Sequence, residues 1–258
     1  MNQAQHPEKL EKLEKPANPG PMVLWKNNKT ITRTYTRTQS RTQPETLLPM
    51  TCDRWLKTST QRTQILYRGD VSMILYHLHL GVGDTVLESG TGTLGLTYAL
   101  SALVGARGKV HTVECNQERY AEAQKEIGLA GLSNTEIYHD TIGGFLQKNT
   151  GTRPDRQILQ KPVDKVVLDI PEPDEVIEGV VSVLRDLGRV CCFVPCVEQI
   201  QRVLKKAATL PVKVERLVEN IEIPHKPKCL EEGVYGTTPQ RVMRGHTGYL
   251  LFLSKTSK

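Results

Sequence analysis

A glycine-rich turn between an expected strand and an expected helix constrains the fold of this chain most strongly. Residues 85–97 read Thr-Val-Leu-Glu-Ser-Gly-Thr-Gly-Thr-Leu-Gly-Leu-Thr, and an apolar segment of helical length follows. Glycine permits the tight reversal and lets a ligand approach the backbone where a Cβ would block it. A purely structural turn would also use glycine, but the order strand, glycine turn, helix is typical of a nucleotide-like cofactor site.

Two carboxylates beside this turn narrow the choice of cofactor. The apolar strand pattern at 109–113 ends at Glu114, where folds of this kind place an acid for ribose hydroxyls. Glu88 ends the strand before the first glycine, and its charge would repel the pyrophosphate of a nicotinamide cofactor. A carboxylate can instead interact with the ammonium group of S-adenosylmethionine, which we therefore expect as cofactor.

Further acidic residues follow later strand patterns. Asp140 follows the strand expected at 135–138, and it can either accept a hydrogen bond from an adenine amino group or cap the next turn. Asp169 follows the strand pattern at 165–168 and precedes two prolines that stiffen the turn. Ligands of open α/β sheets lie beyond the carboxyl ends of the strands, so we expect Asp169 to point at the reaction site.

The last strand patterns distinguish two α/β folds. Residues 213–223 and 249–253 both read as strands, and no helical pattern separates them. Such a terminal antiparallel pair is typical of a methyltransferase sheet and is normally lacking in a nicotinamide-binding Rossmann domain. We expect one α/β methyltransferase domain at 47–258, preceded by a basic segment at 1–46 that is disordered or reduced.

Charge and cysteine usage limit the partners. Residues 1–70 hold 12 Lys and Arg against 6 Asp and Glu, whereas the remainder holds 22 of each. A basic segment suits a phosphate backbone or an acidic partner, although a solvated tail would look the same. The six cysteines show no paired C-x-x-C spacing, and no apolar run reaches membrane-spanning length. We expect no metal site and no membrane segment.

Six motifs in order resemble the catalytic subunit of the tRNA adenine-N1 methyltransferases. These motifs are Arg62-Thr63-Gln64-Ile65-Leu66-Tyr67, Glu88-Ser89-Gly90-Thr91-Gly92, His111-Thr112-Val113-Glu114, Leu168-Asp169-Ile170-Pro171, Pro195-Cys196-Val197-Glu198-Gln199-Ile200-Gln201 and His246-Thr247-Gly248-Tyr249-Leu250. The resemblance implies a Rossmann-like class I S-adenosylmethionine-dependent fold. It also implies methylation of N1 of the T-loop adenine, A58, of tRNA.

The resemblance also implies roles for individual residues. Asp169 would be catalytic and would face both the cofactor and the target base. The polar cluster before the domain and the start of the last strand would contact tRNA, through Arg62, Thr63, Gln64, His246 and Thr247. The cofactor would be held by Asp169 together with Glu88, Gly90, Gly92, Thr93, Leu94, Gly95, Leu96, Glu114, Arg119, Asp140 and Thr141.

The chain departs from the family pattern in two places. Leu94 stands where the family has its third glycine, and Gly95 follows one place later, so we expect Gly95 to supply the freedom that the turn needs. The family also carries a small β-rich N-terminal domain, of which only residues 47–61 look related here. That loss favours a partner chain that supplies tRNA contacts.

Alternatives remain open at this point. A non-catalytic tRNA-binding partner subunit is one, although it would not need Glu114 and Asp169, and a nicotinamide oxidoreductase is another. The resemblance implies a tetramer, either of four such chains or of two with two RNA-binding partners. The partnered form implies the nucleus, and the self-assembling form implies the mitochondrion.

Overall fold

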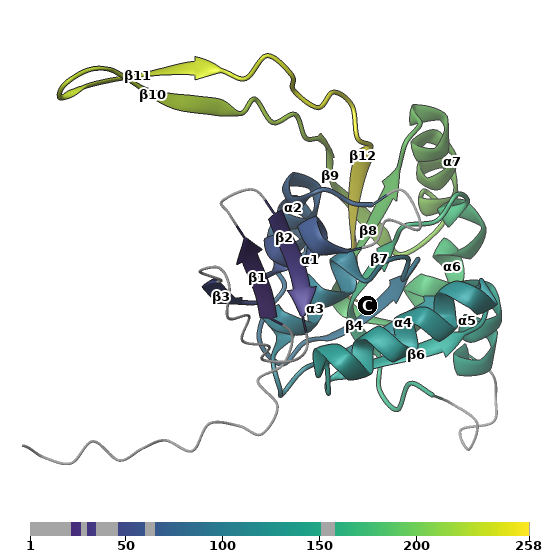
Figure 1. Cartoon of the computed structure of the whole chain (residues 1–258). Helices are drawn as coiled ribbons and strands as arrows, with labels where there is room; N and C mark the ends of the chain where they lie inside the picture. Colours follow the sequence, from purple (N-terminus) through teal and green to yellow (C-terminus); the bar gives the residue numbers. More distant parts are fainter. Residues whose placement is uncertain (1–21, 27–29, 35–45, 60–64, 151–157, 258) are drawn as a thin grey trace, which may run out of the picture.

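The computed structural model describes residues 22–26, 30–34, 46–59, 65–150 and 158–257 (Figure 1). Its centre is a seven-stranded sheet made of β4 (Thr85–Ser89), β5 (Lys109–Glu114), β6 (Thr135–His139), β7 (Val163–Leu168), β8 (Leu184–Val194), β9 (Val212–Glu219) and β12 (Tyr249–Lys255). Their spatial order is β6-β5-β4-β7-β8-β12-β9. The first five run parallel, and β12 runs antiparallel to both neighbours. The expected Rossmann-like sheet with an antiparallel terminal pair is confirmed.

Helices cover both faces of this sheet. They are α1 (Cys52–Thr58), α2 (Arg68–His77), α3 (Gly95–Val104), α4 (Gln117–Ala130), α5 (Ile142–Thr150), α6 (Pro173–Val183) and α7 (Val197–Ala207). Buried side chains of α5, α6 and α7 form one core, and those of α2 and α3 form the core of the opposite face. α1 and α4 contribute to a third cluster, in which Trp55 stacks on Tyr98 with ring centroids 4.6 Å apart.

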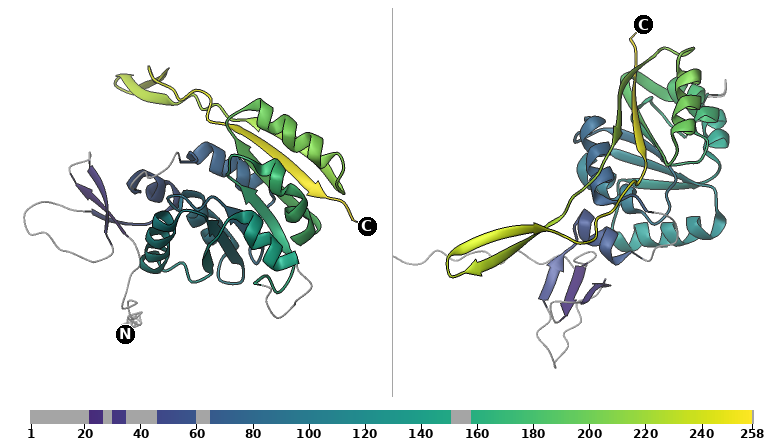
Figure 2. Two further views of the ribbon diagram at one scale, coloured as in Figure 1. Left: turned by 90° about the vertical axis from the view of Figure 1, so that its right-hand side faces the viewer. Right: turned by 90° about the horizontal axis from the view of Figure 1, so that it is seen from above.

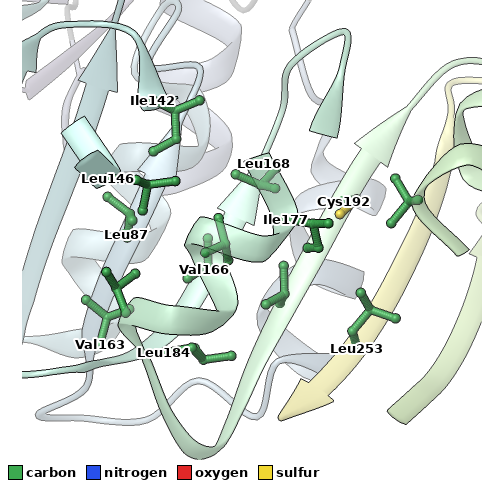
Figure 3. Close-up of a cluster of buried hydrophobic side chains, with 14 of the residues drawn as sticks. Leu87, Ile142, Leu146, Val163, Val166, Leu168, Ile177, Leu184, Cys192 and Leu253 are labelled. Atoms are coloured by element: carbon green, nitrogen blue, oxygen red, sulfur yellow. The ribbon is translucent and has the colours of Figure 1, made fainter. Parts of the chain in front are cut away.

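The strands read as continuous apolar runs because both of their faces are buried. Leu87 and Val166 belong to the core under α5 and α6, which also contains Cys192 (Figure 3). Their sequence neighbours Val86 and Val167 belong to the core under α2 and α3. This alternation fixes the register of the strands, because a one-residue slip would exchange the side chains of the two faces.

A two-stranded hairpin projects from the sheet (Figures 1 and 2). It is formed by β10 (His225–Glu231) and β11 (Val234–Pro239), with Gly233 at φ 78° in its turn. The sequence shows no helical pattern between residues 223 and 249, and it did not predict these two strands. The two strands show no regular alternation of apolar and polar residues and have no buried face, so hydrophobic periodicity gives no signal.

A small separate sheet lies on the N-terminal side of the domain (Figure 2). It contains β1 (Met22–Lys26), β2 (Thr30–Thr34) and β3 (Thr46–Pro49) in the order β2-β1-β3. The boundary expected between residues 46 and 47 falls within β3, and the division into two segments stays a prediction. Across the part of the chain that the structure describes, no helix has the length and apolar character needed to cross a membrane.

Candidate cofactor and substrate site

The carboxyl ends of three central strands converge on the glycine turn. The ladder continues one residue past the strands, since the Gly90 amide donates to the Val113 carbonyl at 3.1 Å and the Asp169 amide donates to the Ser89 carbonyl at 2.9 Å. β4, β5 and β7 therefore bring Glu88, Glu114 and Asp169 to the edge of the sheet that is formed by the carboxyl ends of its parallel strands, as the sequence predicted.

Gly90 is required by this close approach. Its φ of 99° lies in the region that favours glycine, and a Cβ added there would lie 2.3 Å from the Asp169 carbonyl oxygen. Any larger residue would push the turn away from β7. The absence of a side chain at Gly90 thus sets the position of Asp169 relative to the turn.

Glu88 is a fully buried carboxyl with one unsatisfied oxygen. Thr97 donates its hydroxyl to Glu88 Oε2 at 2.6 Å, whereas Oε1 has no hydrogen-bond partner among the described residues. Burial raises the pKa of Glu88 to about 7, despite hydrogen bonds that favour its ionised form. A buried acceptor without a partner is costly, so this oxygen is suited to a donor or a cation brought by a ligand.

Leu94, not Gly95, adopts the left-handed conformation at the end of the turn. Leu94 has φ 61° and ψ 18°, and its side chain is fully buried in the cluster with Trp55. Our prediction that the freedom of glycine had moved to Gly95 was therefore wrong. Gly95 instead provides space, because a Cβ there would lie 2.6 Å from the Leu56 side chain of α1.

Of the other turn residues expected to hold the cofactor, Gly92 is half-buried, and Thr93 and Leu96 are buried. Gly92 has φ 51°, and its amide donates to Glu114 Oε2 at 3.2 Å. Thr93 lies in the turn, with 4% of its surface exposed. The Leu96 side chain packs in the core under α2, so only its backbone can face the turn.

Glu114 is held in its ionised form by several donors. Burial acts to raise its pKa, but hydrogen bonds from Arg119, Asn116 and Gly92 outweigh burial and lower it. Arg119 Nη2 donates to Glu114 Oε1 at 2.7 Å, and the Asn116 amide donates to the same oxygen at 2.9 Å. An ionised carboxylate at this edge can accept hydrogen bonds from ligand hydroxyls.

Asp140 and Thr141 follow β6 at the same edge. Asp140 Oδ2 pairs with Lys148 at 2.6 Å, and Oδ1 accepts from the Thr141 amide at 2.8 Å. Thr141 Oγ1 accepts from the Gly144 amide at 3.1 Å in the first turn of α5. Asp140 thus accepts one backbone amide of the turn before α5, which is part of the capping role that the sequence allowed. A ligand contact by Asp140 stays a prediction.

Asp169 is the second carboxyl with a strongly altered proton affinity. Burial raises the pKa of Asp169 to about 7. The loop that follows it is fixed from β8 and α7, because Gln199 donates Nε2 to the Pro171 carbonyl at 2.8 Å and accepts from the Cys196 amide at 2.9 Å. Sequence reasoning assigned no role to Gln199 or Thr97. An amide or hydroxyl three residues into a helix gives no distinctive signal.

The expected tRNA-contacting residues divide into two groups. Arg62, Thr63 and Gln64 lie outside the described residues. His246 lies beside β8, with Nε2 2.8 Å from the Pro195 carbonyl and Nδ1 2.6 Å from Glu219 Oε1. The Pro195 carbonyl and Glu219 together raise the pKa of His246. Thr247 donates to buried Asp70 at 3.0 Å, which joins β12 to the start of α2.

The arrangement suits a small ligand that carries both positive charge and hydroxyl groups. Carboxyls and turn amides line the site. The Cys191 thiol interacts electrostatically with Asp169, but burial raises the pKa of Cys191 well above its usual value, so this thiol is not a nucleophile. Within the described ranges, no three His, Cys, Asp or Glu side chains gather in a metal-binding group.

Comparisons with known proteins agree on one family. A family model described as "tRNA methyltransferase complex GCD14 subunit" matches residues 45–225. The tRNA (adenine(58)-N(1))-methyltransferase catalytic subunit trmt61a of Dictyostelium discoideum is 34% identical, over 80% of this chain and 77% of the relative. The chain spans 34% to 46% of the length of further curated relatives with the same description.

Solved structures show the same fold. The tRNA (m1A58) methyltransferase TrmI of Aquifex aeolicus has a TM-score of 0.70 at 21% identity, over 93% of this chain and 98% of that one. An S-adenosylmethionine-dependent O-methyltransferase of Thermotoga maritima has a TM-score of 0.73 at 22% identity, over 96% and 97%. At these identities the likeness shows the fold alone. The two solved enzymes share this fold, although their names give different methyl acceptors.

Proposed function

The chain belongs to the family of the tRNA methyltransferase complex GCD14 subunit, and we propose that it is the catalytic subunit of a tRNA (adenine-N1)-methyltransferase. It transfers the methyl group of S-adenosylmethionine to N1 of the T-loop adenine, A58. The observation that carries this proposal is the convergence of Glu88, Glu114 and Asp169 on a turn in which Gly90 is needed for contact with Asp169. A non-catalytic subunit has no use for this arrangement.

The residues at the sheet edge fit S-adenosylmethionine. The unpartnered Oε1 of Glu88 suits the ammonium of the amino-acid part, and ionised Glu114 suits the ribose hydroxyls. In this proposal Asp140 would accept from the adenine amino group, and the backbone of residues 92–96 would contact the cofactor. Bound S-adenosylmethionine supplies a methyl group that its sulfonium already activates, so no covalent catalyst is needed.

Asp169 acts on the methyl acceptor. Adenine N1 is a neutral nucleophile that becomes positively charged on methylation. The ionised carboxylate accepts a hydrogen bond from the adenine N6 amino group, which raises electron density at N1 and offsets the developing charge. The hydrogen bond from Gln199 to the Pro171 carbonyl and the close approach of Gly90 to the Asp169 backbone hold this carboxylate in place before the substrate binds.

The target base must leave its stack to reach this edge. A side chain cannot reach N1 of an adenine that is engaged in tertiary pairing, so the nucleotide is flipped outwards. His246 and Thr247 lie just before β12, and His246 contacts the Pro195 carbonyl at the end of β8. In this proposal the two residues form the outer wall for such a base. Arg62, Thr63 and Gln64 complete the tRNA contacts in this proposal.

A tRNA-binding partner subunit completes the enzyme, in a heterotetramer or, as the alternative, a homotetramer. The hairpin exposes 58% of Leu230 and 77% of Tyr235, so apolar surface on this arm is available to a partner. An isolated two-stranded hairpin is only marginally stable in water, so a second chain is expected to cover it. The nucleus is the proposed compartment, and the mitochondrion is the alternative.

A methyl-transfer assay tests the catalytic role. Labelled S-adenosylmethionine and an unmodified tRNA transcript are incubated with the chain alone and with a candidate partner subunit. Methyl transfer that requires the partner identifies a catalytic subunit whose tRNA contacts are supplied by the partner. Methyl transfer by the chain alone identifies an enzyme that needs no second kind of subunit. Cofactor binding without transfer in either case would favour the non-catalytic alternative.

A further inference from the structure

A cleft of about 710 Å³ lies between α1, the first turn of α2 and the connection from β11 to β12. Thr247 lines this cleft, and the neighbouring His246 contacts the Pro195 carbonyl at the end of β8. The cleft therefore lies against the outer wall of the proposed substrate site. None of the roles assigned above uses its charged residues.

Three cationic side chains line the cleft, and their pairing differs. Lys57 pairs with Asp53 at 2.7 Å, and Arg68 pairs with Glu222. Arg244 is exposed and makes no salt bridge within 4.0 Å to a carboxylate of the described residues. Asp53 and Glu222 are each engaged with another cation. The remaining carboxyl of the cleft, Asp70, interacts electrostatically with Arg244, but Asp70 is buried and accepts a hydrogen bond from Thr247, so the exposed guanidinium of Arg244 keeps its N–H groups available.

Tyr67 holds that charge in a defined place. Arg244 Cζ lies 3.5 Å from the centroid of the Tyr67 ring. A guanidinium on an aromatic face is stabilised by the ring, and its N–H groups along the edge of the plane remain available as donors. Such a group is ordered before a ligand binds, which lowers the entropy cost of each hydrogen bond that it then makes.

We propose that Arg244, ordered by Tyr67, binds a phosphate of the RNA backbone next to the base that is methylated; this inference rests on the proposed function. A guanidinium matches the geometry of a phosphate through two parallel N–H···O bonds. Arg244 is two residues from His246, so a phosphate bound there positions the strand that delivers the base. Arg244 is thus a positioning residue for RNA and takes no part in the methyl transfer itself.

Three variants of the full chain test this role. Arg244→Ala removes the charge, Arg244→Lys keeps the charge without the planar fork, and Arg241→Ala removes a charge from the same exposed connection as the matched control. Binding of unmodified tRNA is measured at several salt concentrations, and kcat and KM for tRNA are measured alongside the affinity for S-adenosylmethionine. The assay is run with any partner that the wild-type activity requires.

We expect Arg244→Ala to weaken tRNA binding and raise KM by roughly ten-fold, the effect of a lost bidentate contact. Its salt slope should fall by about one, because one phosphate contact is lost. Arg244→Lys should recover the slope but not the full affinity. kcat, cofactor affinity and the Arg241→Ala variant should stay within about two-fold of wild type, since none of them involves this phosphate.

Several results would overturn the inference. An unchanged salt slope in Arg244→Ala, or an equal loss in Arg241→Ala, would leave only general charge attraction. A fall in kcat at unchanged KM would assign Arg244 to the reaction step instead. If wild-type protein binds S-adenosylmethionine and tRNA but transfers no methyl group, the proposed function fails, while the binding data still decide the role of Arg244.

Discussion

At the scale of single residues, two buried carboxyls dominate the site. Burial raises the pKa values of Glu88 and Asp169 to about 7. Their protonated forms are therefore favoured by folding, and this contribution to stability is complete below about pH 4 and is lost as the pH rises towards 7. A positively charged cofactor has the opposite preference, because it stabilises the ionised carboxylates.

Cofactor binding should therefore release protons near neutral pH. We expect the affinity for S-adenosylmethionine to increase between pH 6 and pH 8, because the ionised carboxylates that bind it become populated across that range. Titration calorimetry in buffers of different ionisation enthalpy measures the number of protons released. S-adenosylhomocysteine is the matched ligand: it keeps the ammonium proposed for Glu88 but lacks the sulfonium charge near Asp169, so it should release fewer protons. Equal release for both ligands would contradict this account.

Leu94 provides a test of backbone strain against packing. A left-handed Leu is strained by roughly 1–2 kcal/mol, but its burial beside Trp55 is worth about 2–5 kcal/mol. Both Leu94→Ala and Leu94→Gly should destabilise the protein. The glycine variant should be the more stable of the two by about 1 kcal/mol, because glycine adopts this conformation without strain. Urea unfolding gives the order, and a more stable alanine variant would rule out strain at Leu94.

At the scale of elements, strand β7 and the glycine turn are coupled through Gly90. Gly90→Ala introduces a Cβ 2.3 Å from the Asp169 carbonyl oxygen, whereas Gly131 has a similar left-handed φ of 67° and open space around it. Both variants gain backbone strain, but only Gly90→Ala moves Asp169. We expect kcat to fall on the order of 100-fold in Gly90→Ala and to stay near wild type in Gly131→Ala. Equal activities would show that displacement of the turn does not matter.

The sequence predicted the elements whose residues combine apolar periodicity with a distinctive end. β4, the glycine turn and α3 were recognised because glycines interrupt an apolar run, and β7 was recognised because Asp169 and two prolines end it. The hairpin was missed because its strands bury neither face. The conformation of Leu94 was missed because sequence places glycine, not leucine, in left-handed turns, and only tertiary packing against Trp55 selects leucine there.

At the scale of the whole molecule, the exposed hairpin is the feature that the proposed assembly must explain. Replacing Leu230 and Tyr235 with lysine adds charge to the arm while the seven-stranded sheet is left unchanged. We expect the mass of the complex in light scattering to fall, because charged residues are excluded from the centre of stable interfaces. Cofactor affinity serves as the control and should not change. A complex of unaltered mass would remove the hairpin from the interface.

The central claim is that the methyl group reaches N1 of the T-loop adenine and that Asp169 promotes this step. Mass spectrometry of nuclease fragments, after reaction of unmodified tRNA with wild-type protein and with Asp169→Ala, tests both parts directly. We expect 1-methyladenosine at A58 with wild-type protein. The Asp169→Ala variant should form it on the order of 100-fold more slowly at nearly unchanged cofactor affinity, because one preorganised interaction with the transition state is lost. Methylation at another atom or position, or an equal rate without the Asp169 carboxylate, would contradict the account.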